Sequence, residues 1–492
     1  MPMEQKKAIY TSGPIGTRML KTAFGMLAGT LAMSGYNIVD TYFVGKLGKI
    51  PLAAMGFTFP VVMLVGCLFH GLGTGVMTTC AQALGGSRQS KAAKLVTSGA
   101  LLVLLFSIFL AVAGLLFSSP LFHLFGAQGR TLTEVTGYMN IWFFGCATAS
   151  LSMMGNNILV AIGDAKNAGR MMVVGLVLNA LFDPLFIFGW GPIPAMGIRG
   201  AALATIIAQC IATVTVFTLV KKKHGLIQFG LLPWREIRAA WTLTIHYAVP
   251  ASIGMLMMPI GSTIITWITA RYGDAAVAAT AAAGRLEMLA FVFPMALGIS
   301  LVSMIGQNFG AREYNRIRSC FRFSMGFAFF FLLFMAVVYT CFADWLVGIF
   351  APKDDPMVHK IMVKCILITV WGFCMIEVHR FSGFFYIGCG RPAVAAWLNA
   401  LRILGLMIPL SFLALYFKSL EGLFYARLAS DLIAGSVGFL LSWKMTKRLP
   451  SDGEPPPPKH AGESVFRKVF QLRNLFSFAQ VQAKIDSSSD TQ

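Results

Sequence analysis

Residues 95–119, LVTSGALLVLLFSIFLAVAGLLFSS, contain no charged side chain. The hydrocarbon core of a lipid bilayer is about 30 Å thick, and an α-helix needs roughly 20 apolar residues to cross it. Backbone polar groups find no water in that core, so a single crossing segment satisfies them within a helix. The stretch therefore predicts a membrane-spanning helix.

The rest of the chain repeats this pattern. Of the 492 residues, 57% are hydrophobic and only 12% are charged, whereas soluble domains carry about 25% charged residues. The sequence predicts an all-α polytopic membrane protein with twelve transmembrane helices. The predicted spans are residues 23–45, 51–82, 95–119, 134–160, 171–190, 198–220, 243–270, 275–307, 321–343, 360–388, 393–417 and 421–443.

The distribution of basic residues predicts the orientation of the chain. Lys and Arg number 40 against 20 Asp and Glu, for a net charge of +20. Such an excess is typical of nucleic-acid-binding proteins. Here most of it lies at the termini and in loops on one side of the predicted membrane, with clusters at 221–223 and 312–322. This is the positive-inside pattern. We therefore expect a multi-pass protein of the cell (cytoplasmic or inner) membrane, with both termini cytoplasmic and no nucleic-acid partner.

A gapless internal repeat relates the two halves of the chain. An offset of 225 residues pairs Gly29 with Gly254, Gly48 with Gly273, Gln82 with Gln307, Gly85 with Gly310 and Pro184 with Pro409. Each half holds six spans, an even number, so both halves have the same orientation. This predicts two six-helix lobes related by a pseudo-twofold axis along the membrane normal. The expected domains are an N-lobe (1–220), a cytoplasmic linker (221–242), a C-lobe (243–446) and a cytoplasmic tail (447–492).

The charged residues inside the membrane are not duplicated. The offset pairs Asp40 with Ile265, Asn179 with Leu404, Asp183 with Ile408, Glu287 with Val62, Glu377 with Ser152 and Arg402 with Val177. We therefore expect the two lobes to perform separate tasks.

Two acids of the N-lobe are candidates for binding a proton or a hard cation. Asp40 follows Asn37 by three residues and Asp183 follows Asn179 by four, so each acid shares a helical face with an amide. Pro184 has no N–H, which frees the carbonyl four residues earlier and predicts a bend. A charge at membrane depth costs roughly 3 kcal/mol or more, and no basic residue is predicted within the membrane core of the N-lobe to pair with it. The alternative is that each acid caps or pairs within the bundle.

The acids of the C-lobe come with arginines. Glu377 and Arg380 are spaced i, i+3, and Arg427 and Asp431 i, i+4, so both can pair on one helix. Structural ion pairs and substrate contacts both remain open for this lobe, and Glu287 and Glu377 are the better candidates for attracting a cationic substrate. The candidate substrate-cavity residues are Asn37, Glu287, Glu377 and Met258.

Motifs of other protein classes are absent from the sequence. It contains no HExxH, no GxxxxGK[ST] and no GxSxG, so we expect neither an enzyme nor ATP-driven transport. The stretch Gly71–Gly75 lies within a span and predicts close helix packing. The nine cysteines form no CxxC pair, which favours free buried thiols. The missing chemistry and the two-lobe repeat also disfavour a channel or a membrane-embedded enzyme.

The tail differs in composition from the rest of the chain. Residues 455–458 are four prolines, which predict a stiff spacer. Apolar residues then recur at helical spacing over 465–479, opposed by basic residues. This pattern predicts an amphipathic helix on the anionic inner leaflet, with a disordered tail as the alternative.

Short motifs in a fixed order carry a family resemblance. They are Tyr36-Asn37-Ile38-Val39-Asp40-Thr41, Val44-Gly45-Lys46-Leu47-Gly48, Gly163-Asp164-Ala165-Lys166, Asn179 with Asp183-Pro184, Gly200-Ala201-Ala202-Leu203-Ala204-Thr205, Gly390-Arg391-Pro392, Arg402 and Ser430-Asp431-Leu432. With them, residues 15–446 resemble the multidrug and toxic compound extrusion (MATE) family, specifically its bacterial drug exporters.

The resemblance implies a secondary active exporter of drugs and other organic cations, driven by antiport of H+ or Na+ through alternating access. The implied site for the coupling ion, H+ or the metal ion Na+, comprises Asp40, Asn179, Asp183 and Thr205, with Tyr138 and Asn156 nearby. Met258 stands where some relatives carry a C-lobe acid, which favours coupling in the N-lobe. We expect a monomer without a cofactor. The runner-up is a lipid-linked precursor flippase of the same superfamily.

Overall fold

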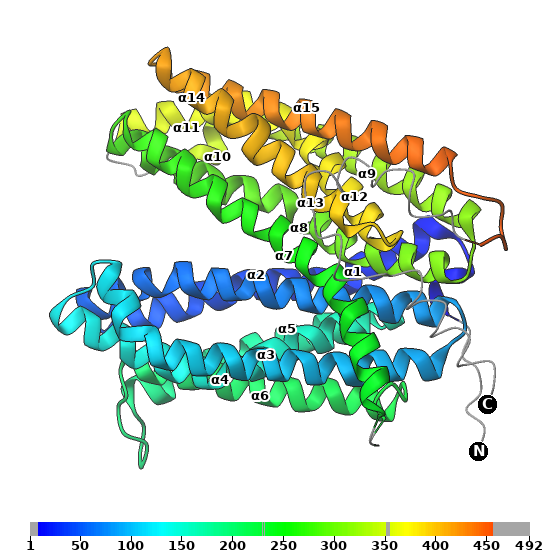
Figure 1. Ribbon diagram of the computed structural model, residues 1–492. Helices are drawn as coiled ribbons and strands as arrows, with labels where there is room; N and C mark the ends of the chain where they lie inside the picture. The colour runs from blue at the N-terminus through cyan, green and yellow to red at the C-terminus, as the bar shows by residue number, and fades with distance from the viewer. Residues whose placement is uncertain (1–7, 229, 231, 351–354, 456–492) are drawn as a thin grey trace.

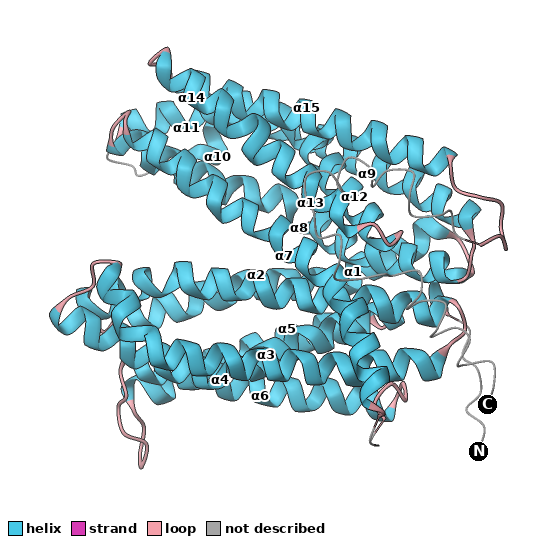
Figure 2. Ribbon diagram, viewed as in Figure 1, coloured by secondary structure: helices cyan, strands magenta, loops and turns pink. Residues whose placement is uncertain are grey.

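The protein is almost entirely helical (Figure 2). The computed structural model describes residues 8–228, 230, 232–350 and 355–455. The predicted amphipathic helix of the tail lies outside these residues. The elements of the first half are η1 (Ile9–Thr11), α1 (Ile15–Gly45), α2 (Lys49–Gly85), α3 (Gln89–Leu124), α4 (Gly129–Ile162), α5 (Ala165–Phe188) and α6 (Ile198–Lys222). Those of the second half are α7 (Trp234–Ala270), α8 (Asp274–Gly310), α9 (Tyr314–Cys341), α10 (Ala343–Phe350), α11 (Pro356–Thr369), η2 (Val370–Gly372), α12 (Phe373–Gly388), α13 (Pro392–Ala400), η3 (Leu401–Met407), α14 (Ile408–Tyr416) and α15 (Leu420–Lys447).

Among the described residues, twelve helical segments are long enough to cross a bilayer. Within the described residues, eleven meet criteria of both length and hydropathy, among them Pro356–Gly388 (α11 to α12) and Pro392–Tyr416 (α13 to α14). The twelfth is α1, whose 31 residues make a helix about 46 Å long at 1.5 Å per residue. The predicted all-α fold with twelve spans is confirmed.

Several helices begin earlier than the hydropathy pattern predicts. The helix α1 begins at Ile15, α7 at Trp234 and α9 at Tyr314, seven to nine residues before the predicted spans. These added turns carry charged residues, which lower hydropathy without interrupting a helix that has left the hydrocarbon core. The expected linker at 221–242 is therefore partly helical, because only residues 223–233 separate α6 from α7. The short α10 was not predicted as a separate element.

The repeat extends to backbone conformation. Gly48, before α2, and Gly273, before α8, have φ values of 113° and 95°. Ser87, after α2, and Arg312, after α8, have φ values of 58° and 59°. Non-glycine residues rarely adopt positive φ, so matching values at the same offset show that the two halves share one scaffold.

The two lobes meet at one end of the molecule and diverge toward the other (Figure 1). We call the end where α1 begins and α15 ends the proximal end, and the opposite one the distal end. The contact is made by α1 and α2 of the N-lobe with α7 and α8 of the C-lobe. A Cβ on Gly71 would lie 1.9 Å from Ser252 Oγ of α7, and one on Gly75 2.6 Å from the Thr244 carbonyl oxygen. The close helix packing predicted for Gly71–Gly75 is confirmed.

The proximal contact obeys the pseudo-twofold symmetry. A Cβ on Gly85 would lie 1.9 Å from the Gln307 carbonyl oxygen, and one on Gly310 1.9 Å from the Gln82 carbonyl oxygen. Both side-chain amides also cross between the lobes. Gln82 Nε2 donates to the Gly388 carbonyl at 3.1 Å, and Gln307 Nε2 donates to the Ala161 carbonyl at 2.6 Å. The axis of the repeat therefore passes between these two glycine–glutamine pairs.

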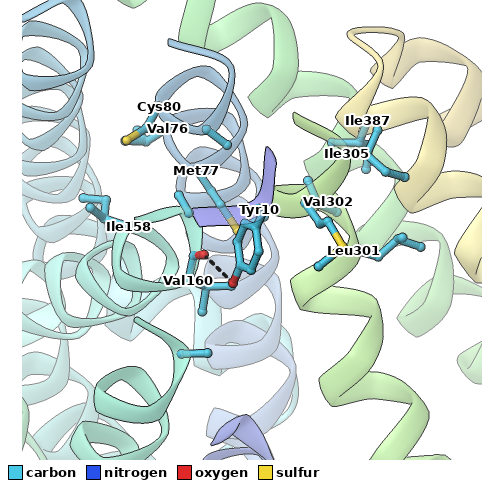
Figure 3. Close-up of a cluster of buried hydrophobic side chains, with 14 of the residues drawn as sticks. Tyr10, Val76, Met77, Cys80, Ile158, Val160, Leu301, Val302, Ile305 and Ile387 are labelled. Atoms are coloured by element: carbon cyan, nitrogen blue, oxygen red, sulfur yellow. Dashed lines mark hydrogen bonds between the residues drawn. The ribbon is translucent and has the colours of Figure 1, made fainter. Parts of the chain in front are cut away.

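Tyr10 of η1 is inserted into this contact (Figure 3). Its ring lies between Met77 and Val160 of the N-lobe and Leu301 and Val302 of α8. Its backbone N–H donates to Gln307 Oε1 at 3.0 Å, and its hydroxyl donates to the Val160 carbonyl at 3.4 Å. Buried side chains of both lobes therefore form one continuous core at the proximal end.

Candidate functional site

Three N-lobe helices place polar side chains at one level near the distal end. Asp40 lies five residues before the end of α1, Asp183 five before the end of α5, and Thr205 seven after the start of α6. With α1 and α5 running toward the distal end and α6 away from it, each residue lies about 7 to 11 Å inside its helix end. The helices α1, α5 and α6 pack against one another, so the structure brings these residues together.

Asn179 is the hub of this cluster. Its Nδ2 donates to Asp183 Oδ1 and to Thr205 Oγ1, both at 3.3 Å. Asp40 lies close enough to Asp183 and Asn179 to interact with both electrostatically. Asp40, Asn179 and Asp183 are all buried. The predicted grouping of four residues from three helices thus forms a real cluster.

The cluster holds oxygen atoms without hydrogen-bond partners among the described residues. These buried atoms are Tyr36 Oη, Asp40 Oδ1, Asn179 Oδ1 and Asp183 Oδ2. Two adjacent carboxylates in a low-dielectric site repel each other, and unpaired buried charge is costly. Within the described part of the chain, no basic side chain forms an ion pair with either acid. A proton or a hard cation bound by oxygen ligands satisfies this arrangement.

The helix α5 continues through Pro184 to Phe188. Because proline has no N–H, the Ala180 carbonyl lacks its usual donor four residues on. This carbonyl lies one turn from Asp183 and adds another oxygen acceptor beside the cluster.

The other predicted N-lobe residues are placed differently. Tyr138 is buried and lies close enough to both acids to interact electrostatically. Asn156 follows it by 18 residues on α4, which separates the two by about 27 Å, so Asn156 does not join the cluster. The side chain of Asn37 lies outside what the structure describes. Tyr36 was missed, although its spacing of four residues from Asp40 places both on one face of α1.

The C-lobe acids form an ion-pair network with arginines. Arg427 donates to both oxygens of Glu287, at 2.6 and 3.1 Å, and Thr369 Oγ1 donates to the same carboxylate at 3.0 Å. Arg402 Nε donates to Asp431 Oδ1 at 2.7 Å. Arg427 Nε lies 4.0 Å from Asp431 Oδ2, the pairing that the i, i+4 spacing predicts.

The predicted pair of Glu377 and Arg380 is also present, at 2.8 Å. Because Glu287 and Glu377 each have an arginine partner, their charges are compensated within the protein. The geometry therefore gives no support to their predicted role in attracting a cation. Met258, the remaining cavity candidate, is an exposed side chain of α7.

A two-lobe bundle of twelve membrane helices, with a buried acid cluster in one lobe, defines a polytopic membrane transporter. A model of the MatE family matches residues 26–185 and 250–413, one segment in each half of the repeat. The chain belongs to this family, and the predicted resemblance to MATE transporters is confirmed.

Individual relatives agree with this assignment. The chain is 30% identical over 434 residues to an FAD transporter of Shewanella oneidensis, covering 88% of this chain and 96% of that protein. It is 24% identical over 458 residues to the multidrug export protein MepA of Staphylococcus aureus, covering 90% and 97%. Its fold matches the Vibrio cholerae MATE transporter VcmN in the bent form with a TM-score of 0.82, at 29% identity and coverage of 88% and 97%.

Proposed function

We propose that this protein is a secondary active exporter that exchanges H+ or Na+ for small organic substrates by alternating access. The observation that carries the proposal is the acid pair Asp40 and Asp183, which is buried, adjacent and without a basic partner among the described residues. Such a site changes its charge with every ion that binds or leaves. That is the property a coupling site needs.

The proposed cycle links this site to α1 and α5. Binding of H+ or Na+ at Asp40 and Asp183 removes the repulsion between the carboxylates, rearranges the two helices and weakens substrate binding on the distal side. One pH unit supplies about 1.4 kcal/mol per proton, and 100 mV supplies about 2.3 kcal/mol per charge moved. One or two ions therefore suffice for a substrate gradient of tenfold to several hundredfold.

The proposed orientation places the proximal end in the cytoplasm. The basic clusters at 221–223 and 312–322 lie where α6 ends and α9 begins, which is the proximal end. The positive-inside rule assigns such clusters to the cytoplasmic side. The structure, closed at the proximal end by the contact around Tyr10, then corresponds to an outward-facing state.

The substrate has two candidate classes. Organic cations and drugs are the first, in keeping with the relative MepA, which is a multidrug export protein. A phosphate-bearing dinucleotide is the second, because the Shewanella relative is an FAD transporter and the C-lobe contains a cluster of arginines. The flippase alternative would move a lipid-linked phosphate through the same frame.

Transport by the purified protein in liposomes tests the coupling. Ethidium efflux is measured while the pH gradient and the Na+ gradient are imposed separately, for the wild type and for Asp40→Asn and Asp183→Asn. We expect one of the two gradients to drive export by the wild type and neither to drive it in the variants. The coupling proposal is wrong if both variants still accumulate the dye under either gradient.

A further inference from the structure

In the C-lobe ion-pair network, the arginine side chains are more exposed than the acidic side chains that they pair with. The carboxylate side chains of Glu377, Asp431 and Glu287 are 0%, 2% and 5% exposed. The side chains of Arg380 and Arg427, which pair with Glu377 and Glu287, are 29% and 33% exposed. Here the acids lie behind the arginines, and the accessible polar atoms are guanidinium N–H groups.

The helix that carries Arg380 is central to the C-lobe. This helix, α12, packs against α8, α9, α13 and α15. The guanidinium carbon of Arg380 lies 5.9 Å from the ring centroid of Phe291 on α8. Arg427 pairs with Glu287 on the same helix, one turn earlier. The two arginines therefore lie beside neighbouring turns of α8, separated by about 6 Å along its axis.

Both guanidinium groups have N–H donors that make no hydrogen bond within the described residues. An arginine has five N–H donors. Within the residues that the structure describes, Arg380 donates one hydrogen bond and Arg427 two, all to carboxylates. No nitrogen of Arg380 or Arg427 is among the buried side-chain atoms without a partner in the described residues, so the remaining donors are accessible to a ligand. A planar fork of N–H groups matches the oxygens of a phosphate, which binds two donors of one arginine at once.

We propose that Arg380 and Arg427 form a binding subsite for a phosphate group of the transported substrate, a proposal that rests on the exporter function above. Glu377 and Glu287 position the two guanidinium groups and keep them neutralised while the subsite is empty. Arg402 is 11% exposed and anchors Asp431, so it serves the network rather than the ligand. The substrate class that fits is a phosphate ester or diphosphate, either of a soluble nucleotide or of a lipid.

Equilibrium binding to the full-length protein in detergent tests this subsite without any ion gradient. The probes are FAD, riboflavin, which has the same ring without phosphate, and phosphatidic acid in mixed micelles as a competitor. Flavin fluorescence anisotropy reports binding of FAD and riboflavin, and the rise in melting temperature on adding phosphatidic acid reports binding of the lipid. If the ligand is a nucleotide, we expect the wild type to bind FAD at least about tenfold more tightly than riboflavin, the ratio that one charge-assisted hydrogen bond supplies. If the ligand is a lipid phosphate, we expect the same arginines to bind phosphatidic acid.

Charge-balanced variants keep the test independent of folding. Arg380→Gln alone leaves Glu377 buried and unpaired, so the informative variants are the pairs Arg380→Gln with Glu377→Gln and Arg427→Gln with Glu287→Gln. Each pair replaces an ion pair by two neutral amides. We expect each to weaken the phosphate-bearing probe about tenfold and to leave riboflavin unchanged. Arg271→Gln, an exposed arginine at the distal end of α7, is the matched control and leaves all probes unchanged.

The outcomes separate the subsite from the exporter function. Loss of phosphatidic acid binding in the paired variants, with no binding of FAD, supports the subsite and assigns it to a lipid phosphate. Equal affinities for FAD and riboflavin with no binding of phosphatidic acid overturn the subsite, as does unchanged phosphate binding in both paired variants. Ethidium export is measured in a separate assay, so its outcome does not affect the conclusion about the phosphate subsite.

Discussion

The N-lobe and the C-lobe share one scaffold but differ in how their buried acids are partnered. In the N-lobe, Asp40 and Asp183 lie together without a basic partner among the described side chains. In the C-lobe, Glu287 and Glu377 each have an arginine within 2.8 Å. The backbone turns at Gly48 and Gly273 nevertheless match. Duplication therefore preserved the packing, while the polar groups diverged, so that of these four described acids only Glu287 and Glu377 have basic partners.

The largest effect on transport is expected when Asp183 of the N-lobe is replaced by the residue at the matching position of the C-lobe. Asp183→Ile places at this position the isoleucine that the repeat has at Ile408. We expect the about 100-fold substrate accumulation that one proton supports under a two-unit pH gradient to disappear. The melting temperature should stay the same or rise, because an unpaired buried acid is replaced by an apolar side chain. Proteoliposome export and thermal unfolding measure the two quantities.

A fall in melting temperature of several degrees would contradict this prediction, because it would show that Asp183 serves packing. Asp183→Asn is the matched control for shape. It should also abolish coupled export while leaving the melting temperature close to that of the wild type.

The corresponding substitution in the C-lobe should lower the stability of the folded protein. Glu287→Val introduces the residue that the repeat has at Val62 and leaves Arg427 without its bidentate partner. Breaking a fully buried pair costs about 3–5 kcal/mol, and we expect a smaller loss here because the Arg427 side chain is 33% exposed. Adding Arg427→Ala, after Ala202 at the matching position, should restore most of the loss. Thermal unfolding of the two variants checks this, and equal instability of the double variant would contradict it.

The sequence predicted the frame of the molecule well, because hydropathy and the 225-residue offset are properties of the chain itself. The start of α6 at Ile198 and the end of α7 at Ala270 coincide with the predicted spans. The proximal starts of α1, α7 and α9 were missed, because charged turns that continue a helix outside the hydrocarbon core lower the hydropathy that marks a span.

The site was predicted where its geometry is local. The pairing of Glu377 with Arg380 follows from i, i+3 spacing, and the grouping of Asn179 with Asp183 from i, i+4 spacing. The contact of Arg402 with Asp431 joins residues 29 apart, and that of Arg427 with Glu287 joins residues 140 apart. Which long arginine reaches which acid depends on how the helices rotate and cross, and no spacing rule supplies that.

A third prediction tests whether the two lobes are equivalent where they meet. Gly85→Ala and Gly310→Ala each place a methyl group against a backbone carbonyl of the opposite lobe. Overpacking of this kind costs about 1–3 kcal/mol, so we expect both variants to open the proximal contact to a similar degree. Labelling of the buried Cys80 by a membrane-impermeant maleimide from the proximal side measures this opening.

Gly56→Ala is the control on the same helix, because a Cβ there meets no atom within 4 Å. Its labelling should equal that of the wild type. If Gly85→Ala labels no faster than Gly56→Ala, close packing at Gly85 does not keep the proximal contact closed.

The smallest effect on stability concerns Asp164, whose side-chain hydrogen bonds at the proximal end have no counterpart, among the described residues, at the matching position of the C-lobe. Asp164 lies in the loop before α5, where its repeat counterpart is Cys389. It accepts hydrogen bonds from Lys223 at 2.7 Å, Asn167 at 2.9 Å and His224 at 3.1 Å. Burial alone would raise the pKa of Asp164, but these donors outweigh it and hold the pKa below its ordinary value.

The sign of the pH dependence follows from that direction. Because the pKa of Asp164 is lower in the folded protein than the unfolded value of about 3.9, its contribution is fully present above about pH 4. It is lost as the pH falls through the folded pKa. Asp164→Asn should therefore lower the unfolding free energy by about 1 kcal/mol at pH 7, and the difference from the wild type should shrink in acid. Thermal unfolding of both proteins from pH 7 to pH 3 measures it, and a difference that stays constant with pH would show that the tie does not depend on the charge of Asp164.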